Sequence, residues 1–318
     1  MAENQAFESE IGRISGVLKT MHEALRPPAA MLAQADRDLV IPDAAQLAAT
    51  EERLRAELPG WWEIEASVAR LVAGLATEIG VRKAEFDSRE QPTRLEKPIG
   101  YISKAAMRRR LEARWRRSRP LHHLAELLGR IDLLTGLVRA ERDTLLSERR
   151  ACESQLAAFI DHRPKIMGIL RSEIGGGMTR VEAARHIGRC VGVFQAFVDV
   201  LNGRVGSGNV CLHKLMTDTE DLLIHYQAIS EILGLHGDEN LDPDVFPNLA
   251  AGMGRFSSGM LTVHGLDLRR DRADRAFIER FPPEAAEEKA AEEETAEVRP
   301  AKIGLRLPAI PRLKFLRS

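Results

Sequence analysis

The sequence predicts an all-α protein: an elongated helical bundle or antiparallel coiled coil around one long central helix, followed by a disordered acidic C-terminal tail. Good helix formers, Ala, Leu, Glu and Arg, dominate the 318 residues, whereas alternating runs of β-branched and aromatic residues are nearly absent. Residues 121–162 contain no proline, and apolar side chains recur there at every seventh position. From residue 282 onward the apolar periodicity gives way to acids and then bases, which is typical of a tail without a packed fold.

Composition and the cysteine count indicate the compartment. Hydrophobic residues make up 44% of the chain, enough for a buried core. The three cysteines are too few and too scattered for a disulfide framework, which favours a reducing environment. The acidic start does not resemble a signal peptide, and no apolar run approaches the ~20 residues of a membrane span. We therefore expect a cytoplasmic protein, with peripheral attachment to a membrane as one option.

The first hundred residues are predicted to form an N-terminal helical region, 1–100. Apolar residues step by three and four between positions 7 and 25, and Pro27 and Pro28 are expected to end that helix. A second helix is expected over residues 45–58, ended by Pro59. A third is expected to open at Trp61 and to end before the breaker region 92–98.

Residues 101–236 are predicted to form the bundle core around the helix 121–162, which would be ~63 Å long at 1.5 Å per residue. Its d positions are Leu124, Ile131, Val138, Leu145, Cys152 and Phe159, whereas its a positions include Thr135, Arg142 and Arg149. A half-polar a column favours packing in a bundle or antiparallel pair over a strong parallel zipper. Such a length suits a scaffold better than a compact catalytic domain.

The rest of the core is predicted from caps and glycines. A short helix should follow Pro164, and Thr179 with Glu182 has the pattern of a capping box that opens a helix ending near Leu201. A glycine loop over residues 203–208 should then precede a further helix. Residues 237–281 are predicted to be an acidic, proline-containing linker with one short helix over 270–281.

The net charge of -1 hides a segregated distribution. Residues 104–119 carry eight basic side chains against one acid, a local charge of +7. On a helix, Met107, Leu111 and Trp115 line up as a narrow apolar stripe, with basic residues over most of the remaining circumference. The candidate anion-binding residues are Lys104, Arg108, Arg109, Arg110, Arg114, Trp115, Arg116, Arg117 and Arg119.

Three interpretations of this basic helix stand side by side. Its stripe could pack on the neighbouring bundle while its arginines pair with acids elsewhere. It could lie on an anionic membrane surface with Trp115 as the interfacial anchor. It could also neutralise the phosphate backbone of a nucleic acid without contacting specific bases.

The tail, residues 282–318, has charge segregation of its own. Residues 284–297 carry a charge of -6, and residues 302–317 carry +5 with apolar side chains between the bases. This pattern is typical of an acidic tether that ends in a docking peptide, although an end that binds nothing or folds back onto the tether fits equally well. The candidate docking residues are Leu305, Leu307, Ile310, Arg312, Leu313, Lys314, Phe315, Leu316 and Arg317.

No motif indicates catalysis, a metal or a cofactor. His186 with Cys190, and Cys211 with His213, lack the paired spacings of zinc sites and are better explained as core and surface residues. The segment from Asp238 has no glycine or glutamate at the calcium-loop positions that need them, and neither GxSxG nor a phosphate-binding loop is present. Residues 178–188 weakly resemble the first helix of a helix-turn-helix, but no polar recognition helix follows.

The sequence therefore predicts a non-enzymatic cytoplasmic scaffold or adaptor. Its Arg-rich helix would contact an anionic surface, and its C-terminal tip would dock a protein partner. The alternative is a nucleic-acid-associated helical protein that uses the same arginines. A second copy of the chain is also a candidate partner.

Overall fold

The computed structural model describes residues 2–90, 93–94, 96–117, 120–172, 178–233, 245–253 and 263–282, and these residues form helices without a strand. The predicted all-α fold is confirmed. All the described helices lie in the unit Met1–Phe281. The predicted disordered tail lies outside the described residues from position 283 onward. Within the described part, no helix is both long enough and apolar enough to span a membrane.

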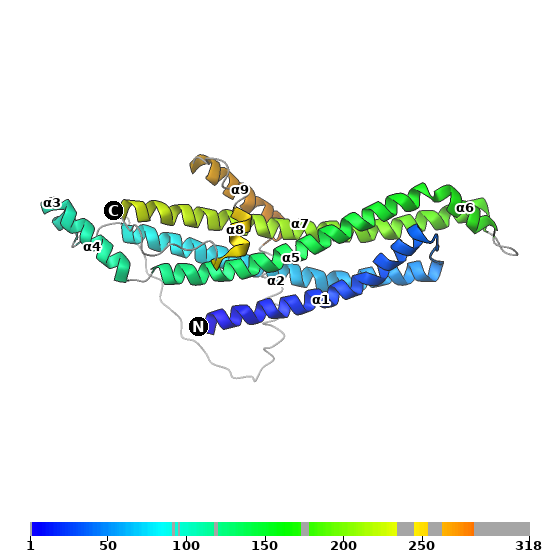
Figure 1. Cartoon of the computed structure of the whole chain (residues 1–318), viewed down its shortest axis with the longest axis horizontal. Helices are drawn as coiled ribbons and strands as arrows, with labels where there is room; N and C mark the ends of the chain where they lie inside the picture. Colours follow the sequence, from blue (N-terminus) through cyan, green and yellow to red (C-terminus); the bar gives the residue numbers. More distant parts are fainter. Residues whose placement is uncertain are drawn as a thin grey trace, which may run out of the picture. The chain divides into compact units, whose positions relative to one another are not determined.

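Four long helices form an elongated bundle in this unit: α1 (Ala2–Arg37), α2 (Ala44–Glu90), α5 (Pro120–Asp161) and α7 (Arg180–Leu233) (Figure 1). The 54 residues of α7 give it a length of about 81 Å. Contacts along the bundle set the directions. Glu65 of α2 contacts Ser207 of α7, and Lys83 farther along α2 contacts Asp221, so these two helices run in the same direction.

The heptad prediction for the central helix is confirmed. All six predicted d residues of α5, from Leu124 to Phe159, are at most 6% exposed. In the a column Thr135 is fully buried, whereas Arg149 reaches out to the side chain of Asn202 on α7. Glu141 of α5 pairs with Arg204 of α7, and Arg149 farther along α5 contacts Asn202 earlier on α7, so the two helices are antiparallel within the bundle, one of the arrangements that the half-polar a column predicts.

The prediction that prolines end the first two helices is wrong. Helix α1 continues through Pro27 and Pro28, and α2 continues through Pro59. An internal proline removes a backbone hydrogen bond and costs roughly 3 kcal/mol. In both helices, buried side chains continue at helical spacing past the prolines. They are Met21, Leu25, Pro28, Leu32 and Ala35 in α1, and Leu47, Leu54 and Trp61 in α2. Burial of that stripe outweighs the lost hydrogen bonds.

The capping box at the start of α7 is confirmed, because the Thr179 amide donates to Glu182 Oε2 (2.8 Å) and the Glu182 amide donates to Thr179 Oγ1 (3.3 Å). The predicted glycine loop is wrong, since α7 runs unbroken through residues 203–208. The turn that a helix-turn-helix needs at Gly188 is likewise absent, because Gly188 lies inside α7. Helix α6 (Arg163–Ser172) supplies the predicted short helix, and the triglycine after it lies outside the described residues.

Two helices fall within the predicted linker. Helices α8 (Pro247–Met253) and α9 (Val263–Arg280) pack on the bundle, and Leu249 and Phe277 are buried in its core. Asp132 of α5 accepts the Leu249 amide (2.8 Å), and Lys214 of α7 pairs with Asp274 of α9. Helix α9 starts earlier than predicted, and the calcium-like segment after Asp238 lies outside the described residues.

The apolar core has two parts. We call them the α6-side cluster, which contains Leu32, Leu156, Ile166 and Phe194, and the α4-side cluster, which contains Phe86, Trp115, Leu128 and Leu215. Helices α2, α5 and α7 contribute to both clusters. The short helices α3 (Glu96–Ile102) and α4 (Lys104–Arg117) lie at the end of the bundle opposite α6 (Figure 1).

Candidate functional site

The Arg-rich helix predicted from the sequence is α4, and its apolar stripe is a core contact. Leu111 and Trp115 are buried in the α4-side cluster, with Trp115 only 2% exposed. The indole packs against the ring of Phe86 with a centroid separation of 5.4 Å. Trp115 is therefore a core residue, as in the interpretation that packs the stripe on the bundle, and it is not exposed to serve as the interfacial anchor of the membrane interpretation.

Helix α3 folds back along α4, and we call the two together the α3–α4 hairpin (Glu96–Arg117). Ser103 separates the helices and caps α4, since its Oγ accepts the Ala106 amide at 3.2 Å. The Glu96 carboxylate at the start of α3 accepts from Arg114 Nη1 near the end of α4, at 2.9 Å. This ion pair requires the chain to reverse at Ser103.

Glu96 is a buried acid that is not among the residues predicted from the sequence. Its Oε2 also accepts the backbone amide of Thr93, at 2.8 Å. Burial by itself raises the pKa of Glu96, but the Thr93 hydrogen bonds and the nearby charges of Arg114 and Arg110 lower it more, so the carboxyl stays ionised. The Glu96–Arg114 ion pair therefore holds the start of α3 against the end of α4.

The predicted anion-binding side chains differ in their availability. Arg114 is committed to Glu96, and Arg108 is exposed but interacts within the protein. Lys104, Arg109 and Arg110 are exposed, and none has an acidic oxygen within 4 Å among the described residues, although the charge of Arg110 acts on Glu96. The side chains of Arg116 and Arg117, and the whole of Arg119, lie outside the described part.

The most exposed large apolar side chains of the described part lie in the turn of the hairpin. Tyr101 is 92% exposed and Ile102 is 88% exposed. Neither residue belongs to the predicted site, because the prolines up to Pro98 favour a breaker region and the pair lies outside the apolar stripe of the basic helix. An adjacent aromatic and aliphatic pair between Gly100 and Ser103 is the signal that would have found them.

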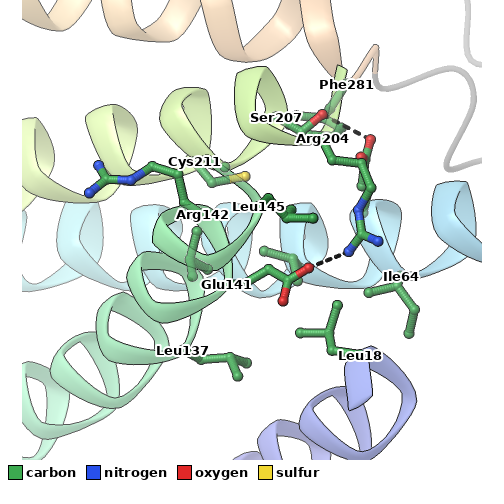
Figure 2. Close-up of a pocket in the computed structure, with 14 residues that line it drawn as sticks. Leu18, Ile64, Leu137, Glu141, Arg142, Leu145, Arg204, Ser207, Cys211 and Phe281 are labelled. Atoms are coloured by element: carbon green, nitrogen blue, oxygen red, sulfur yellow. Dashed lines mark hydrogen bonds and ion pairs between the residues drawn. The ribbon is translucent and has the colours of Figure 1, made fainter. Parts of the chain in front are cut away.

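A second group of polar side chains lies where α1, α2, α5, α7 and α9 meet (Figure 2); its members are buried or half-buried, apart from the exposed Arg280 of α9. We call it the polar layer; its members are His22, Glu65, Glu141, Arg204, Ser207 and Arg280. His22 Nε2 lies 2.7 Å from Glu141 Oε2, and Arg204 donates to the other oxygen of the same carboxylate. Ser207 donates to Glu65 (2.9 Å) and accepts from Arg280 Nε (2.8 Å).

Arg204 is the most deeply buried charge of the polar layer, at 7% exposed. Its guanidinium carbon lies 5.1 Å from the centroid of the Trp61 ring, a cation–π contact. Its Nε and Nη1 are buried without a hydrogen-bond partner. Beside it is a cavity of about 50 Å³ whose lining includes Glu65, Glu141 and Ser207. Figure 2 shows Glu141 and Ser207 beside Arg204. Room for a few water molecules next to unsatisfied donors is consistent with internal hydration.

The thiol beside the polar layer and the zinc candidates are buried or engaged in contacts of the fold. Cys211 lines the cavity, but burial raises the pKa of its thiol to about 12, so it carries a proton at neutral pH and is a poor nucleophile. The zinc candidates are not brought together: His186 Nε2 contacts the carbonyl of Pro42 at 2.7 Å, and Cys190 is fully buried. Among the described residues no three potential ligands gather around a metal position.

No family model, curated protein or solved structure matches this chain. Function therefore has to be inferred from the residues themselves. The predicted docking tip, residues 305–317, lies outside the described residues. The exposed cations of the α3–α4 hairpin are the predicted site residues that the structure places at the surface.

Proposed function

We propose that the protein is a non-enzymatic scaffold or adaptor that the α3–α4 hairpin holds on the anionic face of a membrane. The observation that supports this proposal is the exposure of Lys104, Arg109 and Arg110, which have no ion-pair partner among the described residues. Arg109 precedes the buried Leu111 by two residues, roughly 200° of helical rotation, so it faces away from the bundle. The buried Leu111 and Trp115 attach one side of α4 to the bundle, and the cations on the other side are available to contact a flat anionic surface.

The strength of this contact is modest. Each Lys or Arg near an anionic leaflet contributes about 1 kcal/mol, so three such residues give roughly 3 kcal/mol, about a hundredfold in affinity. The contact is screened by salt within about 10 Å at 0.1 M. We therefore expect weak, reversible attachment that depends on anionic lipid.

The test is vesicle flotation of the full chain with phosphatidylcholine alone and with 30% phosphatidylserine. The triple variant Lys104→Gln, Arg109→Gln, Arg110→Gln should bind the anionic vesicles at least tenfold more weakly. The matched control replaces Lys19, Arg26 and Arg55 by Gln, because these are also exposed and without ion-pair partners in the described part.

Equal losses in the two triple variants would contradict the proposal, because they would show a dependence on net charge alone. A titration with duplex DNA over a salt series tests the other candidate partner, a nucleic acid. Binding to DNA with a steep loss in salt, and none to vesicles, would favour the nucleic-acid alternative instead.

The proposal includes a second contact through the C-terminal tip. The interleaving of Leu313, Phe315 and Leu316 with basic residues supports docking to a protein partner. Affinity purification of the full chain against residues 1–300 tests it: at least one partner should disappear with the deletion, and an unchanged partner set and localisation would argue against docking.

A further inference from the structure

We infer that Tyr101 and Ile102 insert into the headgroup boundary of an anionic bilayer and anchor the α3–α4 hairpin there. This inference rests on the proposed membrane contact and adds the residues that enter the lipid. Both side chains are more exposed than any other large apolar side chain of the described part. Exposure of that degree leaves the full apolar area of two neighbouring side chains available for burial in a partner.

The hairpin holds this pair at its turn. Ile102 is the last residue of α3, and α4 begins at Lys104 after the capping residue Ser103. The opposite end of the hairpin is attached to the bundle through the buried Trp115 and is closed by the Glu96–Arg114 ion pair. The turn is therefore the part of the hairpin that extends from the end of the bundle (Figure 1).

The two helices of the hairpin pack closely next to the turn. A Cβ atom on Gly100 would lie 2.6 Å from Met107 Sδ, so only glycine lets α3 approach α4 this closely without a shift of the methionine. Met107 thus occupies the inner side of the turn, and the neighbouring Tyr101 and Ile102 remain on its outer side, in solvent.

The charges around the turn favour lipid as the partner. Residues 97–111 contain five basic side chains and no acid. Lys97 is exposed one helical turn before Tyr101, and Lys104 is exposed two residues after Ile102. A tyrosine suits the membrane interface because its ring is apolar and its hydroxyl stays hydrated. Ile102 favours lipid over a contact with the phosphate backbone, because an aliphatic side chain gains free energy by burial in hydrocarbon and none beside a charged backbone.

The experiment uses the full chain carrying Ile102→Cys labelled with the environment-sensitive fluorophore NBD. Selective labelling is feasible because the three native cysteines are buried. Ala56→Cys, labelled in the same way, is the matched control, since Ala56 is also exposed but lies on α2 beside Leu54 of the α6-side cluster, away from the hairpin. With vesicles of 30% phosphatidylserine, NBD emission at position 102 should rise at least about twofold and shift to the blue, whereas position 56 should change little.

A second variant tests the contribution to affinity. Tyr101→Ser with Ile102→Ser keeps every cation, so it should retain salt-sensitive binding and lose about tenfold in affinity for anionic vesicles at low and high salt alike, because salt does not screen the apolar contribution. An unchanged affinity in this variant would overturn the anchor.

The outcomes separate the inference from the proposed function. If the wild-type chain binds anionic vesicles but NBD at position 102 does not respond, the anchor is wrong and the surface contact stands. If the wild-type chain binds no anionic vesicle, the proposed function fails and the anchor fails with it. A response of position 102 to duplex DNA alone would overturn the lipid assignment.

Discussion

His22 and Arg204 bind the two oxygens of one carboxylate, that of Glu141, from opposite helices of the bundle. Glu148 lies 3.6 Å from the second nitrogen of the same imidazole. The hydrogen bond from His22 to Glu141 and the nearby carboxylate of Glu148 raise the pKa of His22 to about 9, against the opposing effect of burial. The imidazole is therefore a cation at neutral pH and joins α1 to α5.

This pKa predicts a pH-dependent stability. The raised pKa of folded His22 stabilises the fold fully below pH ~6.5, and this contribution disappears as pH rises through about 9. Because the side chain is 20% exposed, we expect about 1–2 kcal/mol rather than the full value of the shift. Urea unfolding of the wild type and His22→Gln should differ by this amount at pH 6 and by much less at pH 9.5. A constant difference between the two proteins would contradict the prediction.

At the scale of elements, the long helices continue wherever a heptad of buried side chains continues. In α7 the column Ile187, Phe194, Leu201, Gly208, Leu215, Leu222 and Ile229 passes through the glycine-rich segment without a change of register. The adjacent column places Arg204 between Phe197 and Cys211, which is why a charge lies in the core. Following these columns across glycines and prolines would have predicted both the unbroken helix and the buried arginine.

Gly206 provides the test of the unbroken helix. It is exposed within α7, and an added Cβ would meet no atom within 4 Å. Gly206→Ala should therefore raise the free energy of unfolding by about 0.5–1 kcal/mol, because alanine loses less backbone entropy in a helix. Chemical denaturation measures the change. A destabilised variant would indicate a loop at this position, as the glycines alone suggest.

At the scale of the described unit, the polar layer separates the two apolar clusters. On α2, Ile64 belongs to the α6-side cluster and Ala69 to the α4-side cluster, with Glu65 between them. On α7 the change falls between Val205 and Cys211, across Ser207. Because α2, α5 and α7 pass through both clusters, we expect the two halves to unfold together.

The reactivity of two buried cysteines can measure the unfolding of the two apolar clusters separately. Cys190 lies in the α6-side cluster and Cys211 in the α4-side cluster, and burial raises the pKa of these thiols to about 11 and about 12. Native protein at pH 8 should react with a disulfide reagent at least roughly a hundredfold more slowly than unfolded protein. In single-cysteine variants, labelling at the two positions should become fast at the same urea concentration. Separate midpoints would mean that the polar layer divides the unit into two cooperative parts.

The sequence by itself determined the helical class, the buried column of α5 and the capping box at Thr179, because these depend on composition and on spacings within one helix. Tertiary structure decided where helices end: burial of continuous columns outweighs the local penalties of Pro27, Pro59 and the glycines of α7. Tertiary structure also decided which side chains of the α3–α4 hairpin are buried and which are exposed. Trp115 is buried by a contact with Phe86, whereas the reversal of the chain at Ser103 leaves Tyr101 exposed. Contacts between residues so far apart in the chain are not encoded in the spacing of residues along one helix.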